Sequence, residues 1–231
     1  MRAAHFCSAC GKVQPPAPVD YFSFFGLPPK LRLDTSALER DFYQLSRRLH
    51  PDVKAGADPQ EQTWSLEKSS QLNDAYRTLR DPILRTQYLL RLQGVELEEQ
   101  SKSATEKARA TGETKKQVVP PSLLEEVFEL NMQLEELRRN RKMGETDPAL
   151  VEELQRRKRD LESSSEALSR ELQGYWDEWD RLVDAPTASA GSPEAARKPV
   201  LDKMTDLLNR RNYIRNLVRD VNGALEEQEA S

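Results

Sequence analysis

Leucines and aromatic residues recur every three or four positions along much of the chain, which is the spacing of amphipathic α-helices. Over residues 20–94 this pattern predicts helices that begin after Asp34-Thr35-Ser36, near Pro59 and at Pro82. Ser36 and Glu39 are spaced for a capping box at the first of these helices. Pro51 stops that helix and Gly94 ends the third. The side chains expected to face inward are Leu38, Phe42, Leu45 and Leu49, then Trp64, Leu72, Ala75, Tyr76 and Leu79, then Leu84, Tyr88, Leu89 and Leu92.

The same spacing returns over residues 120–225, where breaks near residues 144–148 and 185–193 separate three long helical segments. Three such helices with short loops predict an antiparallel three-helix bundle. Strand-like alternation is nearly absent, so the predicted fold class is all-α, an N-terminal helical hairpin followed by this bundle. The expected core residues are Leu123, Val127, Leu130, Leu134 and Leu137; Leu150, Leu154, Leu161, Leu168, Leu172, Tyr175, Trp179 and Leu182; and Leu201, Met204, Leu207, Leu208, Ile214, Leu217, Val218 and Val221.

The first helix of the bundle carries a second apolar stripe that its core does not need. Leu124, Phe128 and Met132 lie roughly 100° to 180° around the helix from the core stripe. The stripe is either a further buried surface or an exposed binding patch, and its position alone does not decide between the two. The near-heptad spacing of the other two helices also suits self-association, so a monomer and a weak dimer both remain open.

Composition divides the rest of the chain and limits its chemistry. Residues 1–19 form an N-terminal segment, residues 95–119 a polar, flexible linker and residues 226–231 a tail. The net charge of −4 argues against general nucleic-acid binding. With 9 glycines, 2 histidines and no nucleotide-binding or nucleophile-elbow motif, the chain is predicted not to be an enzyme. The sequence has no predicted membrane span or signal peptide, which favours a cytoplasmic location.

The two cysteines form a C-x-x-C-G motif, Cys7 to Gly11, which is half of a zinc knuckle. Tetrahedral zinc needs four ligands, and the sequence offers only these two and His5 nearby. No cofactor is predicted to be required, and zinc would need ligands from an upstream segment or a second chain. The alternative is a disordered, reduced cysteine pair.

The tripeptide His50-Pro51-Asp52 lies in the loop between the first two long helices. Taken alone, it is a helix stop followed by an exposed aspartate, and Arg40, Arg47 and Arg48 are an ordinary solvated face. Acid–base catalysis by His50 has no support, because no second catalytic group is predicted near it.

The surroundings of this tripeptide resemble the J domain of DnaJ-type co-chaperones, and most closely the HscB family. The segments that carry the resemblance are DYFSFFGLP at 20–28, LHPDV at 49–53 and YRTLRDPILRTQYLLRLQG at 76–94. The resemblance implies that residues 20–94 stimulate a heat-shock ATPase chaperone of the HscA/DnaK class. The expected chaperone-binding residues are His50, Pro51, Asp52, Arg40, Arg47 and Arg48.

The same resemblance gives the second apolar stripe a role. HscB proteins hold the IscU-type iron–sulfur scaffold with this helix, which implies scaffold contacts at Leu124, Phe128, Glu129, Met132 and Tyr213. Glu125 falls on another contact position of the family, and the residue types of Glu125 and Met132 both depart from the expected ones. The predicted function is therefore that of an iron–sulfur co-chaperone. The alternatives are a J-domain co-chaperone for a different client and a structural helical adapter.

Overall fold

The computed structural model describes residues 5–54, 56–95, 97, 123–145, 147–185 and 193–229. The chain divides into two compact units. One unit contains residues 1–95 and 176–200, and the other contains residues 96–175 and 201–231. The described residues form helices and one isolated antiparallel bridge, between Phe6 and Val13, so the all-α prediction is confirmed. None of the helices described is both long and apolar enough to cross a membrane.

Aspartate side chains define where the helices of the first unit begin. Helix α2 (Thr35–Leu49) is capped by Asp34, which accepts hydrogen bonds from the backbone N–H groups of Ser36 and Ala37. The predicted capping box from Ser36 is therefore wrong, because Asp34 already occupies the cap position. Helices α3 (Pro59–Arg80) and α4 (Pro82–Leu92) both start at an Asp-Pro pair, whose carboxylate caps the helix while proline occupies its first turn.

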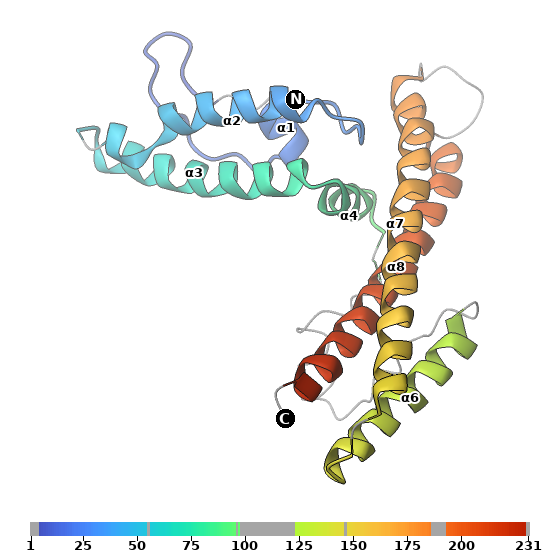
Figure 1. Ribbon diagram of the computed structural model, residues 1–231. Helices are drawn as coiled ribbons and strands as arrows, with labels where there is room; N and C mark the ends of the chain where they lie inside the picture. Colours follow the sequence, from blue (N-terminus) through green and yellow to red (C-terminus); the bar gives the residue numbers. More distant parts are fainter. Residues whose placement is uncertain are drawn as a thin grey trace, which may run out of the picture. The chain divides into compact units, whose positions relative to one another are not determined.

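Helices α2 and α3 pack against each other in antiparallel directions and form the centre of this unit (Figure 1). Near one end the Tyr76 hydroxyl donates to Glu39, and at the other end Ser65 and Ser69 donate to the Leu49 carbonyl. A stacked pair of rings, Phe42 on Tyr76 with centroids 4.1 Å apart, lies between these ends. The short helices α1 (Tyr21–Phe25) and η1 (Pro51–Lys54) both contact α3.

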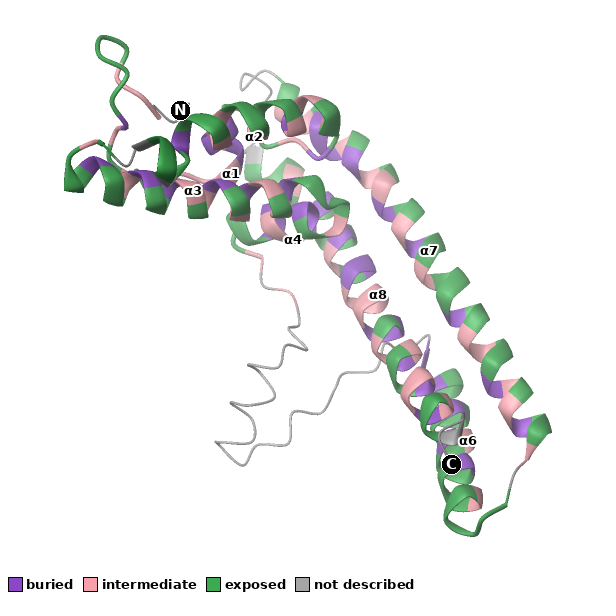
Figure 2. Cartoon of the chain, turned by 60° about the vertical axis from the view of Figure 1, so that its left-hand side comes forward, coloured by how far each residue is buried: buried purple, intermediate pink, exposed green. Residues whose placement is uncertain are grey.

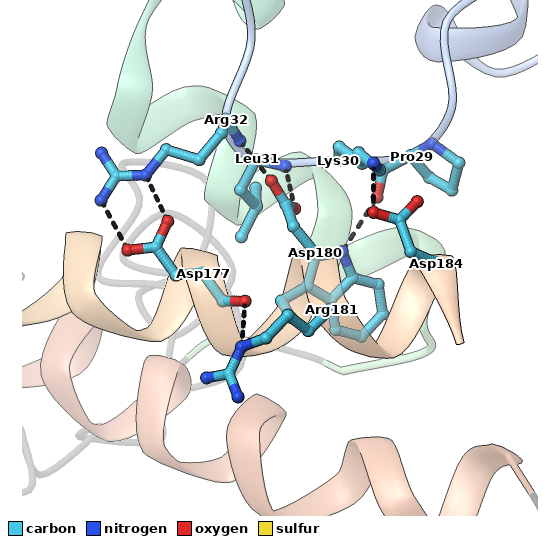
Figure 3. A network of polar contacts seen from close by, with 9 residues as sticks. Pro29, Lys30, Leu31, Arg32, Asp177, Asp180, Arg181 and Asp184 are labelled. Carbon is cyan, nitrogen blue, oxygen red and sulfur yellow. Dashed lines mark hydrogen bonds and ion pairs between the residues drawn. The ribbon is translucent and has the colours of Figure 1, made fainter.

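The segment of residues 29–32 is bound by the last turns of α7 (Pro148–Asp184) within the same unit (Figure 3). The Asp180 carboxylate accepts hydrogen bonds from the backbone N–H groups of Leu31 and Arg32, at 2.7 and 2.9 Å. The Trp179 indole donates to the Pro29 carbonyl. The hydrogen bonds that Arg32 donates to Asp177 lower the pKa of that exposed carboxyl group.

This division of the chain differs from the predicted boundaries of 20–94 and 120–225. The last turns of α7 and the first turns of α8 (Pro193–Glu229) group with the N-terminal helices because Trp176, Trp179 and Asp180 are buried there. The sequence pattern had included Tyr175 in the core seam, but the buried ring is that of Trp176, next to the guanidinium of Arg85.

The second unit contains α6 (Leu124–Lys142) and the remaining parts of α7 and α8, with buried residues recurring along both long helices (Figure 2). Side-chain pairs connect the three helices: Glu129 with Arg157, Ser169 with Arg211, and Arg141 with Glu227. Between α7 and α8, Ser169 contacts Arg211 and Tyr175 contacts Lys203, so residue numbers rise on one helix as they fall on the other, as in antiparallel helices. The expected leucine core is confirmed at Leu130, Leu134, Leu154, Leu172, Met204 and Leu208, among others.

Replacing Asp180 with alanine should lower the free energy of unfolding by about 2 to 3 kcal/mol, because two backbone N–H groups lose their acceptor. The measurement is urea unfolding, followed by the fluorescence of Trp176 and Trp179. Asp184→Ala is the control, since Asp184 pairs with Lys30 at the surface and should cost less than about 1 kcal/mol. Equal losses in the two variants would contradict this account of the network.

Candidate functional site

The loop after α2 displays two of its predicted site residues in the solvent. His50 leaves the helix in an extended conformation, at φ −63° and ψ 131°, as expected for a residue before proline. The His50 carbonyl accepts a hydrogen bond from the backbone N–H of Val53 at 3.0 Å. The His50 Nδ1 atom accepts another from the backbone N–H of Asp52 at 3.2 Å. The His50 side chain is 53% exposed and that of Asp52 is 90% exposed, so both are available to a partner.

The three predicted arginines all lie on the exposed side of α2. Arg47 and Arg48 occupy its last turn, where positive charge is favoured by the helix dipole, and Arg40 lies about two turns earlier. Together with the loop they form a basic surface beside an exposed aspartate. Such an arrangement steers association with an acidic partner surface.

Tyr43 belongs to the same helix and is exposed, although the sequence pattern assigned it no role. Its ring lies edge-on to Phe42, which in turn stacks on Tyr76. Burial, followed by the hydrogen bond to Glu39, raises the pKa of Tyr76, so this hydroxyl stays protonated. The sequence did contain a signal for its exposure, because Tyr43 lies outside the stripe of residues expected to face inward on this helix.

The N-terminal cysteine motif lies in a hairpin of the first unit that contacts helices α2 and α3. Phe6 and Val13 form the isolated antiparallel bridge, and the turn between them uses Gly11 at φ +70°. Val13 is buried, and its N–H donates to Glu61 of α3 at 3.0 Å. The Phe6 ring lies 3.7 Å from the guanidinium carbon of Arg48, within cation–π range. Cys7 and Cys10 thus lie in a folded turn, and both are free thiols.

The hairpin offers two thiols rather than a complete zinc site. The described residues contain no group of three or more His, Cys, Asp or Glu side chains able to hold a metal. His5, the third candidate ligand, bonds through Nε2 to the Phe24 carbonyl at 2.9 Å and packs on the Phe24 ring. The residues present thus do not fit a closed tetrahedral site, which needs four ligands.

The second apolar stripe of the bundle is exposed, which resolves the question that the sequence left open. Leu124, Phe128 and Met132 are 54%, 67% and 57% exposed along one side of α6. Glu125 is exposed beside them. Glu129 lies on the same helix and forms an ion pair with Arg157 of α7, at 2.5 Å. Arg157 had no predicted role, because its place beside α6 depends on how the two helices pack.

Tyr213 differs from the other predicted scaffold residues because its side chain is buried in the second unit, with 4% of its surface exposed. Burial, and then the charge of Asp220, raises the pKa of its hydroxyl. In this structure Tyr213 contributes to the bundle core, and its role as a contact stays a prediction.

The family comparison matches one part of the chain. Residues 20–88 match the family model described as the DnaJ domain. This range covers α1 to α4 up to Tyr88, and it contains the tripeptide between α2 and α3. Residues 20–88 therefore match a J domain, as the motifs predicted.

Among proteins with a J domain, the chain is similar to HscB proteins, which confirms the predicted resemblance. It is 44% identical over 79 residues to the co-chaperone protein HscB homolog of Vibrio cholerae, covering 34% of this chain and 46% of that protein. It is 42% identical over 95 residues to the mouse iron-sulfur cluster co-chaperone protein HscB, covering 41% of each. These matches span about half the length of the curated relatives.

Solved structures extend the likeness in fold over nearly the whole chain. The crystal structure of human co-chaperone protein HscB matches with a TM-score of 0.63 and 22% identity, covering 96% of this chain and 90% of that one. The chaperone HscB from Vibrio cholerae matches with a TM-score of 0.57 and 26% identity, covering 90% and 99%. The predicted J domain followed by a helical C-terminal domain is confirmed.

The pKa of the Cys7 thiol is lowered by hydrogen bonds from the backbone N–H groups of Cys10 and Ala9, which stabilise the thiolate. We therefore expect alkylation of Cys7 to inflect at a lower pH in the folded chain than in the urea-unfolded chain. Mass spectrometry after short iodoacetamide pulses, on chelator-treated protein, measures both profiles. Coincident profiles would mean that the turn does not stabilise the thiolate.

Proposed function

We propose that this protein is a co-chaperone that stimulates the ATPase of an HscA/DnaK-class heat-shock chaperone and delivers an IscU-type scaffold for iron–sulfur cluster assembly or transfer. The observation that carries the proposal is the display of His50 and Asp52 beside an arginine-bearing helix within a DnaJ domain. The matches to proteins named as HscB co-chaperones support the iron–sulfur part. A cytoplasmic location stays a prediction from the sequence.

The proposed mechanism is activation of a partner rather than catalysis by this chain. The sequence has no phosphate-binding loop. The hydrogen bond described above between His50 and Asp52 joins the Asp52 N–H to the His50 ring. ATP would be hydrolysed in the chaperone. This chain raises the rate if it binds the hydrolysis-competent state of the chaperone more tightly than the other state. The arginines on α2 would accelerate encounter with an acidic surface, and Asp52 would pair with a cation of the partner.

The α6 surface is the proposed scaffold contact. Leu124, Phe128 and Met132 form an apolar strip with carboxylates along its side, which is the composition of an interface centre with a polar rim. The Glu129 carboxylate is already paired with Arg157, so scaffold binding would exchange that ion pair or extend it. A client other than the scaffold is the second candidate, because nothing in an apolar strip by itself identifies its partner.

Asp52→Asn and His50→Gln should each reduce stimulation of the chaperone ATPase to less than one tenth of the unaltered chain. Both side chains are exposed, so the fold should be unaffected while the chaperone contact is lost. The measurement is single-turnover ATP hydrolysis by the HscA- or DnaK-type chaperone of the same organism, with and without the scaffold.

Asp74→Asn, a change of the same kind on α3, is the matched control and should retain stimulation. Stimulation that grows further with scaffold supports the full proposal. Stimulation indifferent to scaffold would point to a different client, and no stimulation with any chaperone would contradict the J-domain part.

The paired change Leu124→Ala and Phe128→Ala should weaken scaffold binding at least tenfold, about 1.4 kcal/mol, because large side chains at an interface centre carry most binding energy. Calorimetric titration with the scaffold measures the affinity. Stimulation of the chaperone without scaffold should not change. Met143→Ala, which also truncates an exposed apolar side chain at the end of α6, should leave the affinity unaltered. Unaltered affinity in the paired variant would rule out this surface.

A further inference from the structure

The carbonyl of Leu49 is the last one of helix α2, and it immediately precedes the tripeptide His50-Pro51-Asp52. Carbonyl groups in the last turn of a helix have no N–H donor within the helix and need donors from elsewhere. Here the donors are two hydroxyl groups on α3. Ser65 Oγ and Ser69 Oγ each donate to the Leu49 carbonyl oxygen at 2.6 Å.

The two serines are one helical turn apart, so both hydroxyls reach the same oxygen from one face of α3. Ser65 is fully buried and Ser69 is partly buried. Both lone pairs of the carbonyl are thereby used, away from water, where a hydrogen bond is strong and its loss is costly.

The backbone beyond this anchor is organised by short local contacts. His50 accepts from the N–H groups of Asp52 and Val53, which closes a compact turn around Pro51. These bonds fix the shape of the turn but do not connect it to α3. The peptide group that begins the turn includes the Leu49 carbonyl, which α3 holds through the two serine hydroxyls.

We propose that Ser65 and Ser69 are positioning residues that fix the exit of α2 and thereby the orientation of His50 and Asp52 toward the chaperone. The expected effect on stimulation rests on the proposed function, whereas the positioning of the turn is independent of it. The serines would not contact the chaperone. They would raise the fraction of molecules whose tripeptide is already in the binding orientation.

A loss of positioning has a specific kinetic signature. If only a fraction of molecules is competent, the concentration needed for half-maximal stimulation rises by the inverse of that fraction, while saturating chaperone selects the competent form. Ser65→Ala with Ser69→Ala should therefore raise the half-saturating concentration at least threefold with the maximal rate retained. Ser70→Ala is the matched control, because Ser70 is the next residue on α3 and is exposed.

A second pair of variants distinguishes the effect of losing the hydroxyl from the effect of changing the shape of the side chain. Ser69→Thr and Ser69→Val have nearly the same volume, but only threonine keeps the donor. We expect the concentration needed for half-maximal stimulation to be at least twofold lower for Ser69→Thr than for Ser69→Val. Thermal unfolding establishes that each variant is folded at the assay temperature. If the double variant does not fold, the Thr and Val pair decides the question.

Amide hydrogen exchange of Asp52 and Val53, measured by NMR, reports on the turn without any chaperone. Exchange at these amides should be at least threefold faster in the double variant than in Ser70→Ala. Unchanged exchange and half-saturation in a folded double variant, or equal behaviour of the Thr and Val variants, would overturn the proposal. If the unaltered chain stimulates no chaperone, the proposed function fails, and the exchange measurement still decides whether the serines position the turn.

Discussion

The antiparallel pairing of α2 with α3 is the contact on which the rest of the first unit depends. It brings the hydroxyls of Ser65 and Ser69 to the end of α2 and the hydroxyl of Tyr76 to Glu39 near its start. Because the inward stripe of α2 is used for this packing, its arginines are left in the solvent on the other side. The exposed side chains of His50 and Asp52 therefore follow a helix end whose last carbonyl is bonded to a neighbouring helix.

Around this pair of helices, carboxylate side chains bind the backbone N–H groups of two irregular segments, the N-terminal hairpin and residues 31 and 32. Glu61 accepts from the N–H of Val13, and Asp180 accepts from those of Leu31 and Arg32. Both carboxylates are buried and both act on irregular backbone, where N–H groups have no helical partner. The hairpin also reaches α2, because the Phe6 ring lies within cation–π range of the Arg48 guanidinium.

The bundle shows why exposure must be known before a pattern becomes a site. The stripes of Leu130 and of Phe128 look alike in the sequence, yet one is buried against α7 and α8 and the other is in the solvent. The resemblance implied a scaffold contact at Tyr213, whose side chain is buried, whereas Tyr43 had no assigned role and is exposed. Helical spacing gives the face on which a residue lies but not what covers that face.

The sequence by itself determined the helices, their Asp-Pro starts, the tripeptide and the resemblance that explains it, because these depend on local spacing and capping. It could not determine that Asp180 would meet residues 31 and 32, that Arg157 would pair with Glu129, or that two serines would share the Leu49 carbonyl. Those contacts join residues far apart in the chain. They exist only because packing brings their helices and loops together, and the local spacing of residues does not predict which of these residues meet.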